Sequence, residues 1–182
     1  MLSIDYISGA VVKLTRKYMT RNPYELCDWL NIKIHYIDLG PRVKALYNYE
    51  NRMRNIVLNS RVSEIVRRLL VAHELGHDRL HKEIAMFKGF REIETFGLAI
   101  PAEHEANLFA ADLLIDDDEL LNLLYYDNQT FYSIARELYV PEALLDFKLR
   151  ILKHKGHSIE APYLANGDFL KNAIVGCFDE DI

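Results

Sequence analysis

The sequence predicts an α+β fold that is mostly helical, with a small three-stranded antiparallel sheet ahead of one long central helix. Residues 32–36 alternate apolar and polar side chains, which is the period of a β-strand, and residues 43–49 and 55–58 are interpreted as two more short strands. Three strands in succession favour an antiparallel sheet. Most of the remaining chain repeats its apolar residues at helical spacing, and residues 61–81 are apolar on most sides, as expected of a buried helix.

Length and composition indicate one well-packed domain. The chain has 182 residues, of which 50% are hydrophobic and 11% aromatic, so a substantial core is expected. We expect a single domain over residues 1–155, with the C-terminal helices of residues 130–155 packed on it. Residues 156–182 contain Gly156, Gly167, Pro162 and an acidic end, and we expect a weakly ordered tail there.

Charge and cysteine usage restrict the partners and the compartment. The 22 Lys and Arg residues against 27 Asp and Glu residues give a net charge of −5, which argues against nucleic acid as the main partner, because phosphate binding favours a basic surface. Cys27 and Cys177 lie far apart, so a disulfide framework is not expected. We see neither a signal peptide nor a run as long as a membrane span, and we therefore expect a cytoplasmic protein with no membrane partner.

The elements before the central helix follow from periodicity and from turn residues. A first amphipathic helix is predicted over residues 4–18. Asn22-Pro23 starts a second helix, because Asn caps a helix well and Pro suits its first position. A turn at Gly40-Pro41 separates the first two strands. The expected strands are residues 32–36, 43–49 and 55–58.

The central helix is predicted to begin near Arg61, after Asn59-Ser60, which can cap it, and to end near His81. Residues 82–100 show no clear period and are interpreted as a loop with a short helix or strand. A loop of this length beside a functional site is a candidate substrate-binding lip, or simply a packed connection. Four further helices are expected over residues 102–114, 119–126, 131–139 and 141–155.

Within the central helix, His73, Glu74 and His77 form the pattern H-E-x-x-H. Residues four apart lie on one face of an α-helix, so the two imidazoles point the same way, with roughly 6 Å of helix rise between them. Such a pair can bind one zinc ion. Short motifs of this kind also occur by chance in helices without metal. The predicted buried helix, the sheet before it and the carboxylates after it favour the zinc interpretation.

Glu74 suits the role of general base. It cannot easily turn onto the same metal as the histidines, but it can reach a water molecule there. Zinc lowers the pKa of such a water from about 16 toward about 7. Glu74 then takes the proton, the hydroxide attacks a peptide carbonyl, and the proton passes to the leaving amine. The pattern predicts a zinc-dependent peptidase, or a descendant of one.

A catalytic zinc site needs a third protein ligand, and the next predicted helix offers three candidates. Glu103 and Asn107 are four residues apart on one face, where Glu103 can ligate the metal. The side-chain oxygen of Asn107 can accept a hydrogen bond from a ligating histidine. Glu105 lies on roughly the opposite face and ranks second, and His104 ranks third. Alanines at positions 106, 110 and 111 allow this helix to come close to the central one.

The other histidines are interpreted as structural. His81 continues the face of His73 and His77, but it lies roughly 12 Å of helix rise from His73, too far for one ion to bind all three. It either lines the cleft or simply ends the helix, where a cation is favourable, and we prefer the structural interpretation. His35 lies on a predicted strand and is interpreted as a surface or core histidine. The longer pattern H-E-x-x-H-x-x-G-x-x-H is absent.

Two motifs together resemble the ImmA/IrrE family of metallopeptidases. The first runs from Asn59-Ser60 through the H-E-x-x-H stretch, and the second is E-x-E-A-N-x-F-A-A-x-L-L over residues 103–114. The resemblance covers about residues 47–121 and extends more weakly to Val140-Pro141. It implies a zincin-like fold of the gluzincin type with a minimal sheet. It also implies that His73, His77 and Glu103 ligate zinc and that Glu74 is the general base.

The resemblance also suggests a biological role. Members of this family occur on phages and integrative elements, where they cleave or inactivate a helix-turn-helix repressor, and others act in stress responses. The present chain carries no convincing DNA-binding helix-turn-helix beside the peptidase motifs, so the expected repressor is a separate protein.

The sequence is compatible with three functions. The first is a zinc endopeptidase that cuts a specific bond in a regulatory protein, which the intact Glu74 favours. The second is a non-catalytic anti-repressor that holds its partner protein through the same cleft. The third treats residues 131–155 as a DNA-binding helix-turn-helix. The basic residues that would serve it also suit an ordinary helix C-terminus; they are Lys148, Arg150, Lys153 and Lys155.

Overall fold

The structure, a computed structural model, describes residues 1–50, 52–81, 99–125 and 129–159. The described part begins with helices α1 (Ile4–Tyr18) and α2 (Pro23–Trp29) and a three-stranded sheet. Its strands are β1 (Ile32–Ile37), β2 (Ala45–Glu50) and β3 (Met53–Asn59). The helices that follow are α3 (Glu64–Leu80), α5 (Ala99–Leu114), α6 (Asp117–Tyr125), α7 (Phe131–Glu137) and α8 (Glu142–His154).

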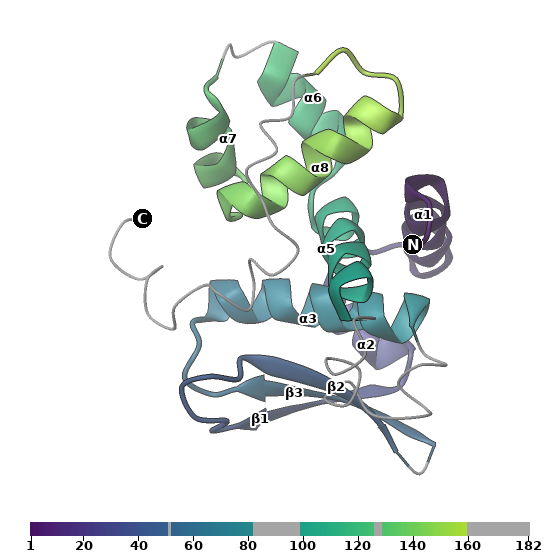
Figure 1. Ribbon diagram of the computed structural model, residues 1–182, viewed down its shortest axis with the longest axis vertical. Helices are drawn as coiled ribbons and strands as arrows, with labels where there is room; N and C mark the ends of the chain where they lie inside the picture. Colours follow the sequence, from purple (N-terminus) through teal and green to yellow (C-terminus); the bar gives the residue numbers. More distant parts are fainter. Residues whose placement is uncertain (51, 82–98, 126–128, 160–182) are drawn as a thin grey trace.

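The α+β class predicted from periodicity is confirmed, and the elements form three levels (Figure 1). The sheet lies at the base, and α3 runs across one of its faces. Helix α5 crosses α3 and extends away from the sheet, with α1 packed beside it. Helices α6, α7 and α8 form the level farthest from the sheet, and α8 packs on α5. The crossing of α3 and α5 is therefore at the middle of the molecule.

The sheet is mixed, which corrects the antiparallel arrangement predicted from sequence. Its strand order is β1-β3-β2, with β2 antiparallel and β1 parallel to β3. Ile37 at the end of β1 pairs with Asn59, and Ala45 at the start of β2 pairs with Leu58. The connection over residues 38–44 therefore crosses the end of β3. The prediction was wrong because consecutive strands usually neighbour each other, and here β3 separates β1 from β2.

Asn59 holds this crossover in place. Its buried side-chain amide donates to the carbonyl oxygens of Gly40 and Val43, both at 2.7 Å. Its Oδ1 accepts from the backbone N–H of Arg61 at 3.0 Å. The predicted cap at Asn59-Ser60 is therefore wrong. Asn59 closes the turn after β3, and α3 begins at Glu64, with Ser63 as its N-cap residue.

Other helix ends follow the expected capping chemistry. The Ser3 side chain accepts from the Tyr6 N–H at the start of α1, and Asn22 accepts from the Tyr24 N–H with Pro23 at the first position of α2. Helix α5 begins at Ala99, earlier than expected, with Pro101 inside its first turn, where a missing N–H costs nothing. The predicted loop over residues 82–100 lies almost wholly outside the described residues, as do positions 160–182 of the expected tail.

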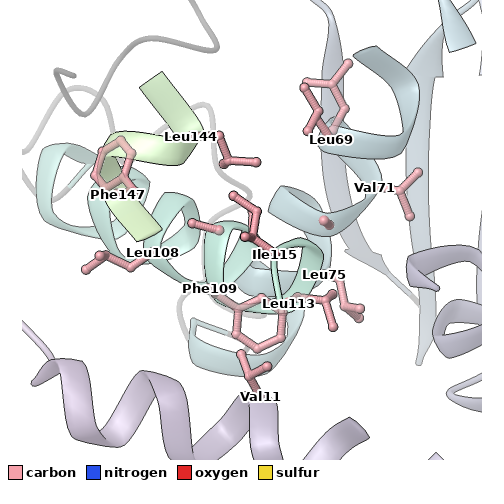
Figure 2. Packing of buried hydrophobic residues seen from close by; sticks show 14 of the residues in the cluster. Val11, Leu69, Val71, Leu75, Leu108, Phe109, Leu113, Ile115, Leu144 and Phe147 are labelled. Atoms are coloured by element: carbon pink, nitrogen blue, oxygen red, sulfur yellow. The ribbon is translucent and has the colours of Figure 1, made fainter. Parts of the chain in front are cut away.

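One hydrophobic core joins the levels (Figure 2). Phe109 of α5 points toward Val11 of α1, and both side chains are buried. Leu75 of α3 and Phe147 of α8 belong to the same core. Cys27 is also buried with a free thiol, and burial raises its pKa to about 12. No described helix is long and apolar enough to cross a membrane.

Candidate metal centre

Helix α3 presents His73 and His77 on one face, one turn apart, at the crossing with α5. Both are buried, with exposed fractions of 4% and 2%. Their rings meet edge to face with centroids 4.7 Å apart, so that the two Nε2 atoms converge. Burying two imidazoles in a helix costs free energy unless their nitrogens are satisfied. The contacts of these nitrogens therefore indicate what the site is built for.

Helix α5 supplies a carboxylate because it approaches α3 very closely. A Cβ atom placed on Gly76 would lie 3.1 Å from Ala106 Cα and 3.2 Å from the Ala106 carbonyl oxygen. Glycine on one helix and alanine on the other thus let the two backbones nearly touch, as the small residues of α5 predicted. Glu103 lies on the same helix, one turn before Asn107, and faces both histidines.

The donor atoms of His73, His77 and Glu103 form a compact cluster. The two Nε2 atoms are 3.1 Å apart. Each oxygen of the Glu103 carboxylate faces one histidine, with Oε2 3.3 Å from His73 Nε2 and Oε1 3.5 Å from His77 Nε2. Ligand atoms around a tetrahedral zinc with bonds of about 2.0–2.1 Å are about 3.3 Å from one another. The measured separations fit such a site, and among the described residues these three form a group able to hold a metal ion.

Proton placement at His73 also favours a cation. Its Nδ1 lies 2.9 Å from Asn107 Oδ1, and because an amide oxygen only accepts, Nδ1 carries the proton. The Nε2 atom of a neutral His73 then turns a lone pair toward the Glu103 carboxylate. Two electron-rich groups at this distance repel each other unless a proton or a metal ion lies between them. The donor set therefore suits a metal ion that prefers nitrogen and oxygen ligands.

The electrostatics of the cluster agree with this assignment. Burial lowers the pKa of His77 to about 3, so this imidazole is neutral and able to ligate. Burial alone would lower the pKa of His73, but the hydrogen bond and negative charge of Glu103 outweigh it and raise that pKa. Burial alone would raise the pKa of Glu103, but hydrogen bonds with His73 and His77 lower it strongly. Glu103 is therefore an anion at neutral pH.

Glu74 lies beside the cluster rather than within it. It follows His73 on α3, is 7% exposed, and its charge is one of those that raise the pKa of His73. The group of donor atoms able to share one ion comprises the two histidines and Glu103, within the described part of the chain. The structure thus brings the sequence-predicted metal ligands together and keeps Glu74 at their side.

The alternative third ligands point elsewhere. Glu105 Oε2 is 2.8 Å from His81 Nε2. His81 faces Nδ1 of His77, whereas Glu103 faces Nε2 of His77. The His104 ring lies against Phe147, with centroids 5.2 Å apart. His35 is exposed on β1 and its Nε2 contacts Asn55 Oδ1 at 3.0 Å. None of these side chains shares the group of donor atoms that Glu103 completes.

Sequence reasoning missed the environment of His81. This residue is 4% exposed, and its Nδ1 lies 3.2 Å from Nδ1 of His77. Its spacing of four residues from His77 was the available signal. That signal did not reveal the contact with Glu105, because the contact depends on how α5 crosses α3.

Two histidines with a glutamate between them on a buried helix, completed by a carboxylate from a crossing helix, are the arrangement of metallopeptidases of the H-E-x-x-H type. Residues 27–150, which contain every residue of this centre, match the IrrE N-terminal-like domain family of peptidases. The chain belongs to this family, the ImmA/IrrE metallopeptidases, as the two sequence motifs indicated.

Two related proteins are similar in sequence to most of the chain. The chain is 31% identical to Metallopeptidase ImmA of Bacillus subtilis (strain 168) over 144 residues, which cover 79% of this chain and 83% of the relative. It is 37% identical to the uncharacterized immunity region protein 2 of Bacillus phage phi105 over 111 residues, which cover 61% of this chain and 69% of the relative.

Proposed function

We propose that this protein is a zinc-dependent endopeptidase that hydrolyses a specific peptide bond in a regulatory protein, a helix-turn-helix repressor of a phage or mobile element. The observation that carries the proposal is the buried cluster of donor atoms from His73, His77 and Glu103. The two Nε2 atoms are 3.1 Å apart, and the two Glu103 oxygens lie 3.3 and 3.5 Å from them. Membership of a metallopeptidase family supports a hydrolytic use for this cluster.

Zinc is the ion that the donor set favours. Two imidazole nitrogens and one carboxylate are the ligands of known catalytic zinc sites, which leave a fourth position open. Calcium and magnesium take oxygen ligands instead, so a site with two nitrogens selects against them. A bound zinc ion supplies Lewis-acid chemistry, since it polarises a carbonyl group and makes water a stronger acid at neutral pH.

The side chains around the ion have separate roles in this proposal. His73, His77 and Glu103 hold it, and Asn107 accepts the Nδ1–H of His73 at 2.9 Å, which turns Nε2 of His73 inward. Glu74 takes the proton of the attacking water and transfers it to the amine that leaves. Because Glu74 is buried beside His73, this proton transfer takes place away from bulk solvent.

The substrate class rests on the relatives and on the family resemblance. One relative bears the name of a phage immunity region and the other the name ImmA. These names, together with the role that the family resemblance implies, support a repressor as the substrate. Such a repressor is cytoplasmic and a separate protein, and we place the peptidase in the same compartment. We also propose that residues 1–155 act as one domain.

Co-expression with a repressor of the mobile element that carries the gene tests this function. We expect the intact protein to produce two fragments of the repressor, with one cleavage site identified by mass spectrometry. Glu74→Gln should keep the zinc but slow the cleavage by about 10²–10⁴-fold, because it removes the general base. Repressor that is bound and inactivated but left uncut by the wild-type protein would instead establish the anti-repressor alternative.

A further inference from the structure

A second buried network adjoins the metal centre on the side of His77. His81 Nδ1 lies 3.2 Å from His77 Nδ1, and His81 Nε2 lies 2.8 Å from Glu105 Oε2. The other oxygen of Glu105 accepts from the Leu2 backbone N–H at 2.5 Å. His81 and Glu105 are each only 4% exposed. The network therefore connects α3, α5 and the segment that leads into α1.

Hydrogen-bond chemistry assigns the protons along this network. A carboxylate only accepts, so the His81 nitrogen that faces Glu105 carries a proton. In a neutral His81 the opposite nitrogen, Nδ1, is then an acceptor. The His77 Nδ1 that faces it must therefore be the donor. A neutral His77 with its proton on Nδ1 turns the lone pair of Nε2 toward His73 and Glu103.

We propose that His81 and Glu105 are positioning residues for the metal centre, which hold His77 in the tautomer and the orientation that bind zinc. This inference rests on the proposed function, because it assumes that His77 is a zinc ligand. His73 is oriented by Asn107 in the corresponding way, through a direct contact of its Nδ1. Each ligating imidazole thus has its own partner, and His77 reaches a carboxylate through a second imidazole.

The burial of Glu105 supports this role over that of an ordinary helix-end contact. A histidine that only ends a helix is usually solvated, whereas His81 and Glu105 are both buried beside a ligand. A buried carboxylate costs free energy unless it is fully hydrogen-bonded, and Glu105 meets donors at both of its oxygens. Partners of ligating residues typically change metal affinity by about 10–100-fold when they are removed.

Zinc affinity in the full-length protein, measured by competition with a chromophoric chelator, tests the proposal. His81→Leu removes the nitrogen that accepts from His77 Nδ1–H, and Glu105→Gln removes the negative charge at the end of the network. His81→Gln keeps an oxygen that can accept from His77 and an amide that can donate to Glu105. The matched control is Asp5→Asn, since Asp5 contacts His154 at 3.0 Å in another histidine–carboxylate pair, away from the metal centre.

We expect His81→Leu and Glu105→Gln to bind zinc about 10–100-fold more weakly, His81→Gln to recover most of the loss, and Asp5→Asn to bind as the wild type does. Imidazole nitrogen NMR of the metal-free wild type should show His77 with its proton on Nδ1. This measurement tests the proposal even if His81→Leu fails to fold.

Two results would overturn the inference separately from the function. Wild-type zinc affinity in both His81→Leu and Glu105→Gln would show that the network is only structural, while the zinc site itself stands. A His77 proton on Nε2 would contradict the assigned tautomer. A wild type that binds no zinc at all would contradict the proposed function itself, and with it the positioning role, which assumes that His77 is a zinc ligand.

Discussion

At the scale of single residues, the buried ionisable groups form two kinds of arrangement. Lys148 has a fully buried side chain and lies 2.6 Å from Asp112 and 2.5 Å from Asp117. Here the opposite charges of an ammonium group and two carboxylates stabilise one another without any further ion. At the metal centre, by contrast, imidazole nitrogens converge on each other and on a carboxylate. This second kind is complete only with a proton or a metal ion among the donor atoms.

The buried ion pairs also bear on DNA binding by α8. Lys148 is inside the protein, Arg150 contacts Asp146 at 2.5 Å, and Lys155 contacts Asp117 at 2.7 Å. Three of the four cations named for a helix-turn-helix are therefore neutralised within the fold. The expectation from net charge that nucleic acid is not the main partner stays a prediction.

Replacing Lys148 with Met should lower the free energy of unfolding by about 3–5 kcal/mol, because it removes the closest cation from the buried Asp112 carboxylate and leaves only Lys155 at 3.5 Å. Urea denaturation at neutral pH measures this change. The control is Lys13→Met on exposed Lys13, for which we expect a change of less than about 0.5 kcal/mol. Equal stability of the two variants would contradict the account of Lys148.

The loss in Lys148→Met should also depend on pH. Burial alone would raise the pKa of Asp117, but hydrogen bonds with Lys148 and Lys155 lower it below its usual 3.8. A lowered pKa in the folded state means that the stabilisation is complete above pH 3.8 and is lost as the pH falls through the folded-state value. The difference in the free energy of unfolding between wild type and Lys148→Met should therefore become smaller in acid.

At the scale of elements, periodicity predicted most of the helices and strands, because each amphipathic pattern is local. The predicted helix over residues 4–18 and the strand positions agree with α1 and the sheet. Strand order could not be predicted in the same way, since the parallel pairing of β1 with β3 depends on a crossover that Asn59 holds. The start of α3 was misjudged for the same reason, because Asn59 serves the crossover rather than the helix.

Gly76→Ala tests the close approach of α3 and α5. The new methyl group would lie 3.1 Å from Ala106 Cα, which is backbone and cannot rotate away. We expect a loss of about 1–3 kcal/mol in stability from overpacking, together with weaker zinc binding, because α3 carries the histidines and α5 carries Glu103. Thermal unfolding and chelator competition measure the two effects.

The matched control is Gly9→Ala in α1. A Cβ on Gly9 meets nothing within 4 Å, so this change should stabilise the protein by up to about 1 kcal/mol through helix propensity. Zinc affinity should stay at the wild-type value in this control. A Gly76→Ala protein with the same stability and zinc affinity as Gly9→Ala would show that the crossing of α3 and α5 accommodates the extra methyl group.

At the scale of the whole molecule, the sheet and α3 form a base on which α5 is laid, and the candidate site lies where the two helices cross (Figure 1). The sequence predicted His73, Glu74 and His77 from one short motif, because helical geometry alone places them. It ranked Glu103 above Glu105 from the shared face with Asn107. The network of His81 and Glu105 needed the tertiary crossing and could not be predicted from spacing.

The number of zinc ions bound per chain shows whether His73, His77 and Glu103 form a zinc site. For protein purified without chelators, we predict about one zinc ion in the wild type and in Glu74→Gln, and almost none in His77→Ala and Glu103→Ala. Wild-type protein without zinc would show that these residues do not form a zinc site. Zinc that is retained in Glu103→Ala but lost in Glu105→Ala would show that the third ligand has been assigned to the wrong carboxylate.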